Sequence, residues 1–343
     1  MPSGSSSKSK PKPADVASET KRKFIPLIRE EYAGRYQINS YLYHQPLVQL
    51  DFHNRPTDFL PPSFYVYPGD PVDGAVNWAR DSGTEVPFIC SANDGRPGGD
   101  WETGAAGYEE RLCRRSTLSA NLATPAPSHR GDPHYPVPMY GGILSPQVVV
   151  FRGPHDRYEK LPPDQWTSLP VVSVPPARWP KLTQNGTKYS FSSEREMVKD
   201  KLRGALRICA ASGYENVVIG DFGLGNGYRN PPQELAELWR EVLLYDPDLR
   251  GRIRHVAFVF EDPAQSTAQL ILDDLAKKSK GSSHGSSSKS KSSSSKSAKS
   301  PASAGGGDCP TDFAIFSRVF HNDEVQRVLT QPDYRYDLNN ILA

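Results

Sequence analysis

The sequence contains no apolar run approaching the roughly 20 residues that a membrane-spanning helix needs. Its first residues are Ser, Lys and Pro rather than an apolar stretch. We therefore expect no secretory signal and an intracellular, cytoplasmic or nuclear, location. Cysteine is scarce as well, since the four cysteines lie far apart and none forms a CxxC pair. This scarcity argues against both a disulfide framework and a zinc ribbon.

A large excess of one charge is also lacking, because 41 Lys+Arg oppose 39 Asp+Glu among 343 residues and leave a formal charge of +2. Eight lysines nevertheless lie in two Ser/Lys-rich stretches that contain no acid: Lys8, Lys10, Lys12, Lys280, Lys289, Lys291, Lys296 and Lys299. Without them the formal charge falls from +2 to −6. A mildly acidic body argues against a duplex-binding protein. Nucleic acid is therefore expected to bind at most through the Ser/Lys-rich stretches.

The composition divides the chain into folded and unfolded parts. Residues 1–20 and the insertion 279–307 are too rich in Ser, Lys and Gly to bury enough apolar surface to offset their ordering entropy, and both are predicted to be disordered. Residues 21–278 are expected to form one domain with an N-terminal extension. Residues 308–343 are predicted to complete that domain, with a strand at 312–316 and a short helix at 323–329.

Short apolar runs alternate with amphipathic stretches through the body of the chain. Strands are predicted over residues 63–67, 86–90, 147–151, 170–174, 217–219 and 255–260. Helices are predicted over residues 70–80, 193–212, 231–245 and 266–277. Apolar strands flanked by helices are typical of an α/β fold, in which a mostly parallel sheet is covered on both faces.

The first stretch able to carry chemistry is a Gly-rich loop over residues 91–107, which joins a predicted strand to a predicted helix. Glycines let the backbone approach a ligand closely. The helix begins with two adjacent carboxylates, Glu109 and Glu110, which complement the helix dipole in its first turn. The pair could serve acid–base chemistry, or it could be two ordinary first-turn acids on a solvated face.

The second stretch runs from the strand at 217–219 through a Gly-rich loop into another helix. Asn230 is expected to be the N-cap, Pro231 the first helical residue and Gln233 the capping-box partner. Loop amides at a helix N-terminus form an anion site, although a tight structural turn is the alternative. The GxGxG spacing and the lack of an acid placed about 20 residues later disfavour a Rossmann site.

Other signals are weaker. No serine lies in a GxSxG elbow, which disfavours a hydrolase of that class. The histidines His53, His134, His155 and His255 show no metal-ligand spacing, and neither a metal nor a cofactor is expected. Trp166, Trp179 and Trp239 are expected to pack in the core or under loops.

Together the two loops resemble the microbial-type poly(ADP-ribose) glycohydrolase family, a branch of the macrodomain-like fold. That family has a strand, then Asn-Ala and Pro-Gly-Gly-Gly, then Gln-Glu-Glu opening a helix that runs into Arg-Ser. The corresponding residues here are Ala92-Asn93-Asp94, Pro97-Gly98-Gly99-Asp100, Tyr108-Glu109-Glu110 and Arg114-Arg115-Ser116. The second loop ends in Asn230-Pro231-Pro232, like the Asn-Pro-Pro of the family. The resemblance spans about residues 60–275 and implies a three-layer α/β/α fold with a mixed sheet.

The resemblance implies an ADP-ribosyl glycohydrolase that acts on ADP-ribose or ADP-ribosylated proteins. Glu110 would be the catalytic acid, Glu109 would position the ribose beside it, and Asn93 would contact the distal ribose. The residues expected around the diphosphate are Gly98, Gly99, Gly223, Gly225, Asn226 and Gly227, with Tyr228 packing on the ligand.

Two residues depart from the family pattern, because Asp100 replaces its third Gly and Tyr108 replaces its Gln. A carboxylate near a diphosphate would repel it unless the side chain points away or pairs with Arg96. These departures raise a second hypothesis, a catalytically silent module that binds ADP-ribose. A third is an interaction protein that uses its Ser/Lys-rich stretches. The sequence leaves open the choice between poly- and mono-ADP-ribose, the acceptor and the oligomeric state.

Overall fold

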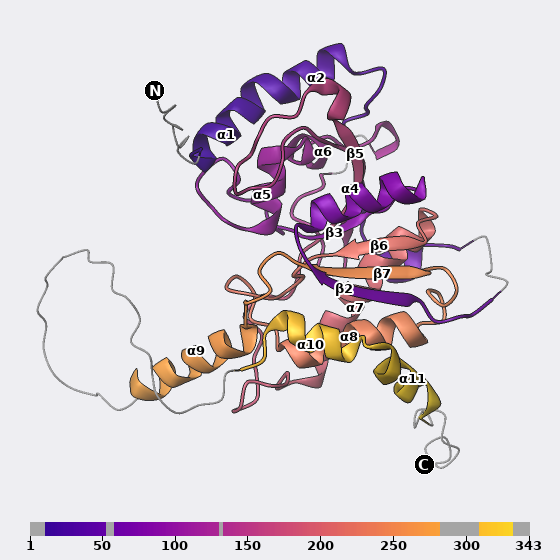
Figure 1. Cartoon of the computed structure of the whole chain (residues 1–343), viewed down its shortest axis with the longest axis vertical. Helices are drawn as coiled ribbons and strands as arrows, with labels where there is room; N and C mark the ends of the chain where they lie inside the picture. Colours follow the sequence, from indigo (N-terminus) through magenta and orange to yellow (C-terminus); the bar gives the residue numbers. More distant parts are fainter. Residues whose placement is uncertain (1–10, 53–57, 130–132, 282–308, 332–343) are drawn as a thin grey trace, which may run out of the picture.

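The structure is a computed structural model that describes residues 11–52, 58–129, 133–281 and 309–331 (Figure 1). A seven-stranded sheet runs through it in the order β1-β4-β5-β3-β6-β7-β2. The strands are β1 (Tyr41–Tyr43), β2 (Ser63–Pro68), β3 (Phe88–Ser91), β4 (Gly142–Val150), β5 (Thr167–Val174), β6 (Asn216–Ile219) and β7 (His255–Phe260). Strands β5, β3, β6, β7 and β2 run parallel, whereas β4 and β1 pair antiparallel at one edge. The predicted mostly parallel mixed sheet is therefore confirmed.

Helices cover both faces of this sheet (Figure 1). One face carries α1 (Pro13–Glu19), the π-helical turn Thr20–Phe24, α2 (Ile25–Glu31), α4 (Pro71–Ser82), α5 (Tyr108–Arg115) and α6 (Leu118–Leu122). The other face carries α7 (Ser192–Ala211), α8 (Pro232–Tyr245) and α10 (Asp312–Val319). The remaining elements are α3 (Pro46–Gln49), α9 (Thr267–Gly281), α11 (Asn322–Thr330) and the 3-10 turns Pro127–His129 and Pro163–Gln165. The α/β/α layering expected from the resemblance is present.

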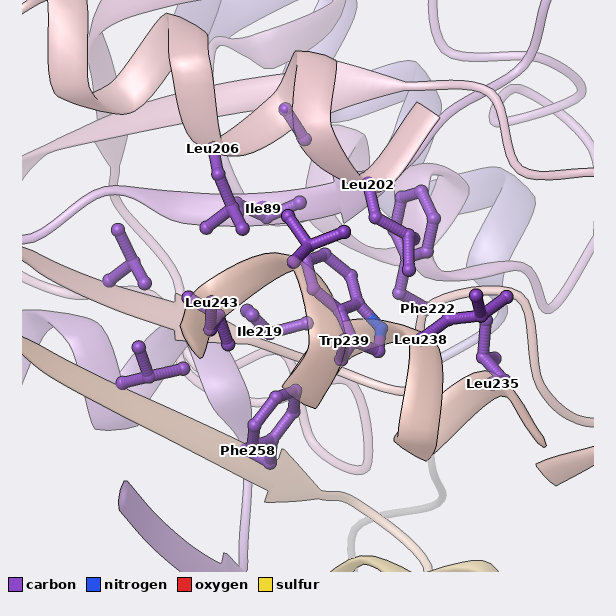
Figure 2. Close-up of a cluster of buried hydrophobic side chains, with 14 of the residues drawn as sticks. Ile89, Leu202, Leu206, Ile219, Phe222, Leu235, Leu238, Trp239, Leu243 and Phe258 are labelled. Atoms are coloured by element: carbon purple, nitrogen blue, oxygen red, sulfur yellow. The ribbon is translucent and has the colours of Figure 1, made fainter. Parts of the chain in front are cut away.

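Side chains of the central strands alternate between two apolar cores, one on each face of the sheet. In β3, Phe88 and Cys90 point into the core under α4 and α5, whereas Ile89 points into the core under α7 and α8. In the second core Trp239 of α8 packs edge-on against Phe258 (Figure 2). Both faces of these strands are buried, which explains their near-continuous apolar sequences.

The prediction of a strand at residues 312–316 is wrong, because these residues begin helix α10. Its buried apolar residues Ile315, Phe316 and Val319 recur with helical spacing, which a five-residue window reads as a strand. Thr311 caps the helix, since its side chain accepts a hydrogen bond of 3.1 Å from the amide of Ala314. The short helix predicted at 323–329 is confirmed as α11.

The predicted disordered tail also differs from the structure in its second half. Residues 11–20 lead into and form helix α1, where Val16 and Ala17 are buried and the Thr20 hydroxyl donates to the Arg114 carbonyl at 2.7 Å. Composition alone misses these anchors because they are few. Residues 1–10 lie outside the described residues, as does the predicted Ser/Lys-rich insertion apart from residues 279–281, which end α9.

Among the described residues, no helix combines the length and apolarity needed to cross a bilayer.

Candidate active site

The two Gly-rich loops leave neighbouring strands at the same edge of the sheet. Strands β3 and β6 pair in parallel through Phe88 with Val218 and Ile89 with Ile219, so the loops that follow them emerge side by side. The hydroxyl of Tyr108 donates to the Asp221 carboxylate and ties the start of α5 to the second loop. Ligands of open α/β sheets bind at this carboxyl edge. The two Gly-rich loops therefore lie next to each other at one edge of the sheet.

The first loop depends on two left-handed glycines. Gly98 and Gly99 have φ angles of +72° and +54°, which side chains rarely adopt. A Cβ on Gly98 would lie 2.8 Å from the Cys113 sulfur, and one on Gly99 would lie 2.5 Å from Glu110 Oε1. The loop backbone is therefore packed directly against helix α5, with no room for a side chain between them.

Asn93 shapes this loop from its start. Its Oδ1 accepts hydrogen bonds from the amides of Gly95 and Arg96, at 2.9 and 3.1 Å. Its own amide donates to Glu109 Oε2 at 2.7 Å. Within the described part of the chain its Nδ2 makes no hydrogen bond.

Glu109 is a buried acid, with only 1% of its surface exposed. Its Oε2 accepts from the Asn93 amide, whereas its Oε1 has no hydrogen-bond partner among the described residues. Burial raises the pKa of Glu109 to about 8, and the negative charge of Glu110 adds to the rise, although the bond from Asn93 opposes it. At neutral pH, Glu109 is therefore mostly protonated and can donate a hydrogen bond.

Glu110 lies beside it, partly open to solvent. Its carboxylate sits between Gly99 and Gly107, where a Cβ on either glycine would collide with it. The Asp100 amide donates to Glu110 Oε1 at 3.3 Å. The two adjacent carboxyl groups thus occupy unlike environments, because Glu109 is buried and protonated whereas Glu110 is partly exposed and accepts a bond from the Asp100 amide.

The second loop is braced from outside. Gly223 and Gly225 have positive φ angles of +74° and +75°. The Gly225 amide donates to Thr267 Oγ1 at 2.8 Å and is therefore already engaged. Arg229 holds the same turn, donating to the Gly225 carbonyl at 3.0 Å and to Asn226 Oδ1 at 2.8 Å. A Cβ on Gly227 would meet nothing within 4 Å, so the loop is open there.

Tyr228 lies close to the carboxylate pair. Burial raises its pKa, and the charges of Glu109 and Glu110 raise it further, whereas the charge of Arg178 lowers it. The Arg178 guanidinium lies 5.5 Å from the centroid of the Tyr228 ring. Tyr228 is therefore near enough to Glu109 and Glu110 for their charges to act on its hydroxyl.

The predicted capping role of Asn230 is wrong. Pro231 occupies the N-cap position of α8, and the Gln233 side chain bonds to Glu237 instead of forming a capping box. The buried Asn230 side chain donates to the carbonyls of Ala177 and Gly223, at 2.9 and 2.8 Å. It therefore closes the loop on itself and on the segment after β5, a tertiary role that local sequence does not reveal.

The structure accommodates both residues that depart from the family pattern, Asp100 and Tyr108. Asp100 forms an ion pair with Arg96, and its side chain is 57% exposed, so its charge is directed to a cation and to water. Tyr108 fills the space between the loops and bonds to Asp221, which is 2% exposed. Burial raises the pKa of Asp221 to about 7, although the Tyr108 hydroxyl lowers it.

Sequence analysis missed Asp221 and a nearby ionic cluster. In this cluster, the side-chain atoms of Asp70, His155 and Glu261 that could ligate a metal ion lie within 4.8 Å of one another. Arg115 pairs with Asp70 at 2.7 Å and Arg111 pairs with Glu261, so guanidinium groups already neutralise both carboxylates. These acids could have been found from their positions in the sequence, because Asp70, Asp221 and Glu261 each follow the end of a parallel strand. Of the other histidines, His134 bonds to Ser40, and His53 lies outside the described residues.

Comparisons with known proteins agree with the observed fold. Residues 28–153 match the family model of the microbial-type PARG catalytic domain. No curated protein sequence matches the chain. The poly(ADP-ribose) glycohydrolase (PARG) of Thermomonospora curvata superposes with a TM-score of 0.56 and 21% identity, covering 77% of this chain and 98% of that chain. Its structure bound to the inhibitor ADP-HPD gives a TM-score of 0.53 at 21% identity, covering 78% and 98%. The poly(ADP-ribose) glycohydrolase of Deinococcus radiodurans in complex with ADP-ribose superposes with a TM-score of 0.46 and 23% identity, covering 63% of this chain and 85% of that chain.

The matched segment contains the first loop and the Glu109–Glu110 pair, and the structural likeness covers 77% of the chain. The resemblance seen in the sequence is thereby confirmed: the chain carries the catalytic-domain pattern of the microbial-type PARG family over residues 28–153, on the fold of the bacterial enzymes.

Proposed function

We propose that this chain is an ADP-ribosyl glycohydrolase of the poly(ADP-ribose) glycohydrolase type, which hydrolyses an O-linked ribose glycosidic bond. The observation that carries the proposal is the Glu109–Glu110 pair at the start of α5, where a buried, protonated carboxyl lies beside a partly exposed one. Glycoside hydrolysis needs a carboxyl group at the scissile bond to protonate the leaving oxygen, and groups beside it to hold the sugar.

The ligand class is ADP-ribose or an ADP-ribosylated protein. Both arginines of the two loops are already paired, Arg96 with Asp100 and Arg229 with Asp274. An incoming diphosphate would therefore be held chiefly by loop amides around Gly98, Gly99 and Gly227. Asn93 Nδ2 and the Tyr228 ring would then bracket the distal ribose.

The reaction needs a proton donor at the leaving oxygen. Glu110 would donate its proton to that oxygen as the ribosyl C–O bond breaks and positive charge develops on the ribose. It would then accept a proton from the water that attacks the same carbon, which regenerates the acid. Such general acid catalysis is worth about 10²–10⁴ in rate. The neutral Glu109, whose Oε1 is unpartnered, would donate a hydrogen bond to a ribose hydroxyl and so position the sugar.

The test is the release of free ADP-ribose from poly(ADP-ribose) and from an ADP-ribosylated protein, followed by chromatography. Calorimetry measures ADP-ribose binding in the same preparation. Steady release by the parent chain supports the proposal. Binding without release would instead support the catalytically silent ADP-ribose-binding module.

We also propose an intracellular location. The four cysteines are free, and Cys90, Cys113 and Cys209 are buried. Unpaired thiols of this kind suit a reducing compartment. Microscopy of the tagged full chain tests this, and a secreted product would contradict it.

A further inference from the structure

A cavity of about 380 Å³ lies beside the second loop, between residues 179–191 and helix α9. Among the side chains that line it are Trp179, Lys181, Phe191, Arg229, Asp274 and Lys278. None of these residues has a role in the hydrolytic mechanism.

Two large aromatic side chains in this cavity are exposed to water. Trp179 is 57% exposed and Phe191 is 52% exposed, whereas Trp166 and Trp239 are buried. The expectation that all three tryptophans pack in the core or under loops is therefore wrong for Trp179. Paired exposed aromatic side chains that line a cavity indicate a binding site for a flat, partly apolar group.

The indole of Trp179 is held in place by the second loop. The backbone amide of Trp179 donates to the Tyr228 carbonyl at 2.7 Å, and the Arg229 guanidinium lies 4.8 Å from the centroid of the indole ring. Trp179 and Arg229 have φ angles of +51° and +65°, a backbone region that non-glycine residues rarely adopt. Such conformations persist only where the surrounding structure fixes them, and they cluster at binding sites. Arg229 covers one side of the indole, and the exposed remainder is available for stacking.

The charge of the cavity favours an anion. Asp274 offsets the charge of Arg229, since it pairs with that guanidinium at 2.8 Å. Lys181 and Lys278 also line the cavity and leave it positive. The Lys181 ammonium lies 5.6 Å from the centroid of the Phe191 ring, so a cation and an aromatic face are presented together. Stacking surfaces combined with cations recognise a nucleobase that carries phosphate.

The cavity and the carboxylate site share two backbone segments. Tyr228 lies near the carboxylate pair, and its neighbour Arg229 lines the cavity. In the same way Arg178 lies over the Tyr228 ring, and its neighbour Trp179 lines the cavity. The cavity and the carboxylate site are therefore neighbours, joined by residues 178–179 and 228–229.

We propose that this cavity binds the adenine nucleotide of a second unit of a poly(ADP-ribose) chain while the terminal unit occupies the carboxylate site. The proposal rests on the proposed function and extends it, because it assigns a contact outside the carboxylate site to the unit that precedes the terminal one.

The experiment compares the binding of free ADP-ribose and of short, purified poly(ADP-ribose) oligomers to Glu110→Gln, the variant expected to leave them intact. The oligomer should bind about tenfold more tightly than ADP-ribose, since one stacked base is worth about 1–3 kcal/mol. Trp179→Ala in the same background should remove this advantage without changing ADP-ribose affinity, and Trp179→Phe should restore it. Phe59→Ala is the matched control, because Phe59 is also 57% exposed and lies 5.7 Å from an arginine, outside the cavity.

The outcomes separate the two proposals. If neither the parent chain nor Glu110→Gln binds ADP-ribose, the proposed function fails. If ADP-ribose binds but the oligomer has no advantage, or the advantage survives Trp179→Ala, the second subsite is disproved. AMP binding that depends on Trp179 without any oligomer advantage would also overturn it, because the cavity would then serve a free nucleotide.

Discussion

The carboxylate of Glu110 occupies the space that a side chain on Gly107 would need. Gly107 has a φ of −66°, which any residue adopts, so space and not backbone conformation requires glycine there. Gly99 leaves room for the same carboxylate from the other side. The Glu110 carboxylate can therefore occupy this position only because residues 99 and 107 have no side chains.

Replacing Gly107 by Ala should displace the Glu110 carboxylate while the fold stays intact. Misplacing a catalytic group by about 1 Å costs about 10²-fold in rate. We expect a loss of this order in ADP-ribose release, measured beside the thermal unfolding midpoint. Gly104→Ala is the matched control, since a Cβ there meets nothing within 4 Å. Equal activity of the two variants would contradict the prediction.

Replacing Glu110 by Gln keeps the shape of the side chain and exchanges its carboxyl group for an amide, which cannot act as a general acid. Turnover should fall by about 10²-fold or more, whereas the affinity for ADP-ribose should change little. Rates and calorimetric affinities measured on the same preparation check this. Glu102→Gln, at an exposed glutamate paired with Lys21, should leave turnover unchanged. Undiminished turnover in Glu110→Gln would assign the catalytic acid to another residue.

Glu109 should make the protein less stable as the pH rises. Its pKa is raised from 4.5 to about 8 by burial, so between these values the folded chain keeps a proton that the unfolded chain has lost. The free energy of unfolding therefore falls as the pH increases through this window. Glu109→Gln should reduce the loss between about pH 6 and pH 8 by about 2 kcal/mol in urea titrations. An unchanged pH slope in Glu109→Gln, the same as in Glu102→Gln, would refute the burial argument.

Removing the Tyr108 hydroxyl should destabilise the site through Asp221. Oδ1 of Asp221 has no hydrogen-bond partner among the described residues, so the Tyr108 bond to Oδ2 matters more. Tyr108→Phe should lower the free energy of unfolding by about 1–3 kcal/mol and raise the pKa of Asp221 further. Tyr67→Phe is the control, because the Tyr67 hydroxyl makes no hydrogen bond within the described part of the chain. Equal effects of the two changes would show that the bond contributes nothing specific.

Sequence patterns predicted the features that depend on local periodicity and spacing. The apolar runs at 217–219 and 255–260 match β6 and β7, and the two predicted Gly-rich loops follow β3 and β6. Sequence patterns did not predict features that depend on contacts between residues far apart in the chain. The buried partners of Asn230 include Ala177, 53 residues away, and the ring of Trp179 contacts Arg229 of the second loop instead of packing in the core. The strand predicted at 312–316 failed because its window was shorter than two helical turns.

The aromatic packing of α10 has a consequence for biosynthesis. Phe316 and Phe320 lie 5.2 and 4.4 Å from Phe258 of β7, measured between ring centroids. A ribosome must therefore add some 60 residues beyond Phe258 before this aromatic surface is covered. Until then the nascent chain presents a phenylalanine-rich face to chaperones. Release of a product that stops short of Phe320 would leave the same face uncovered and prone to aggregation.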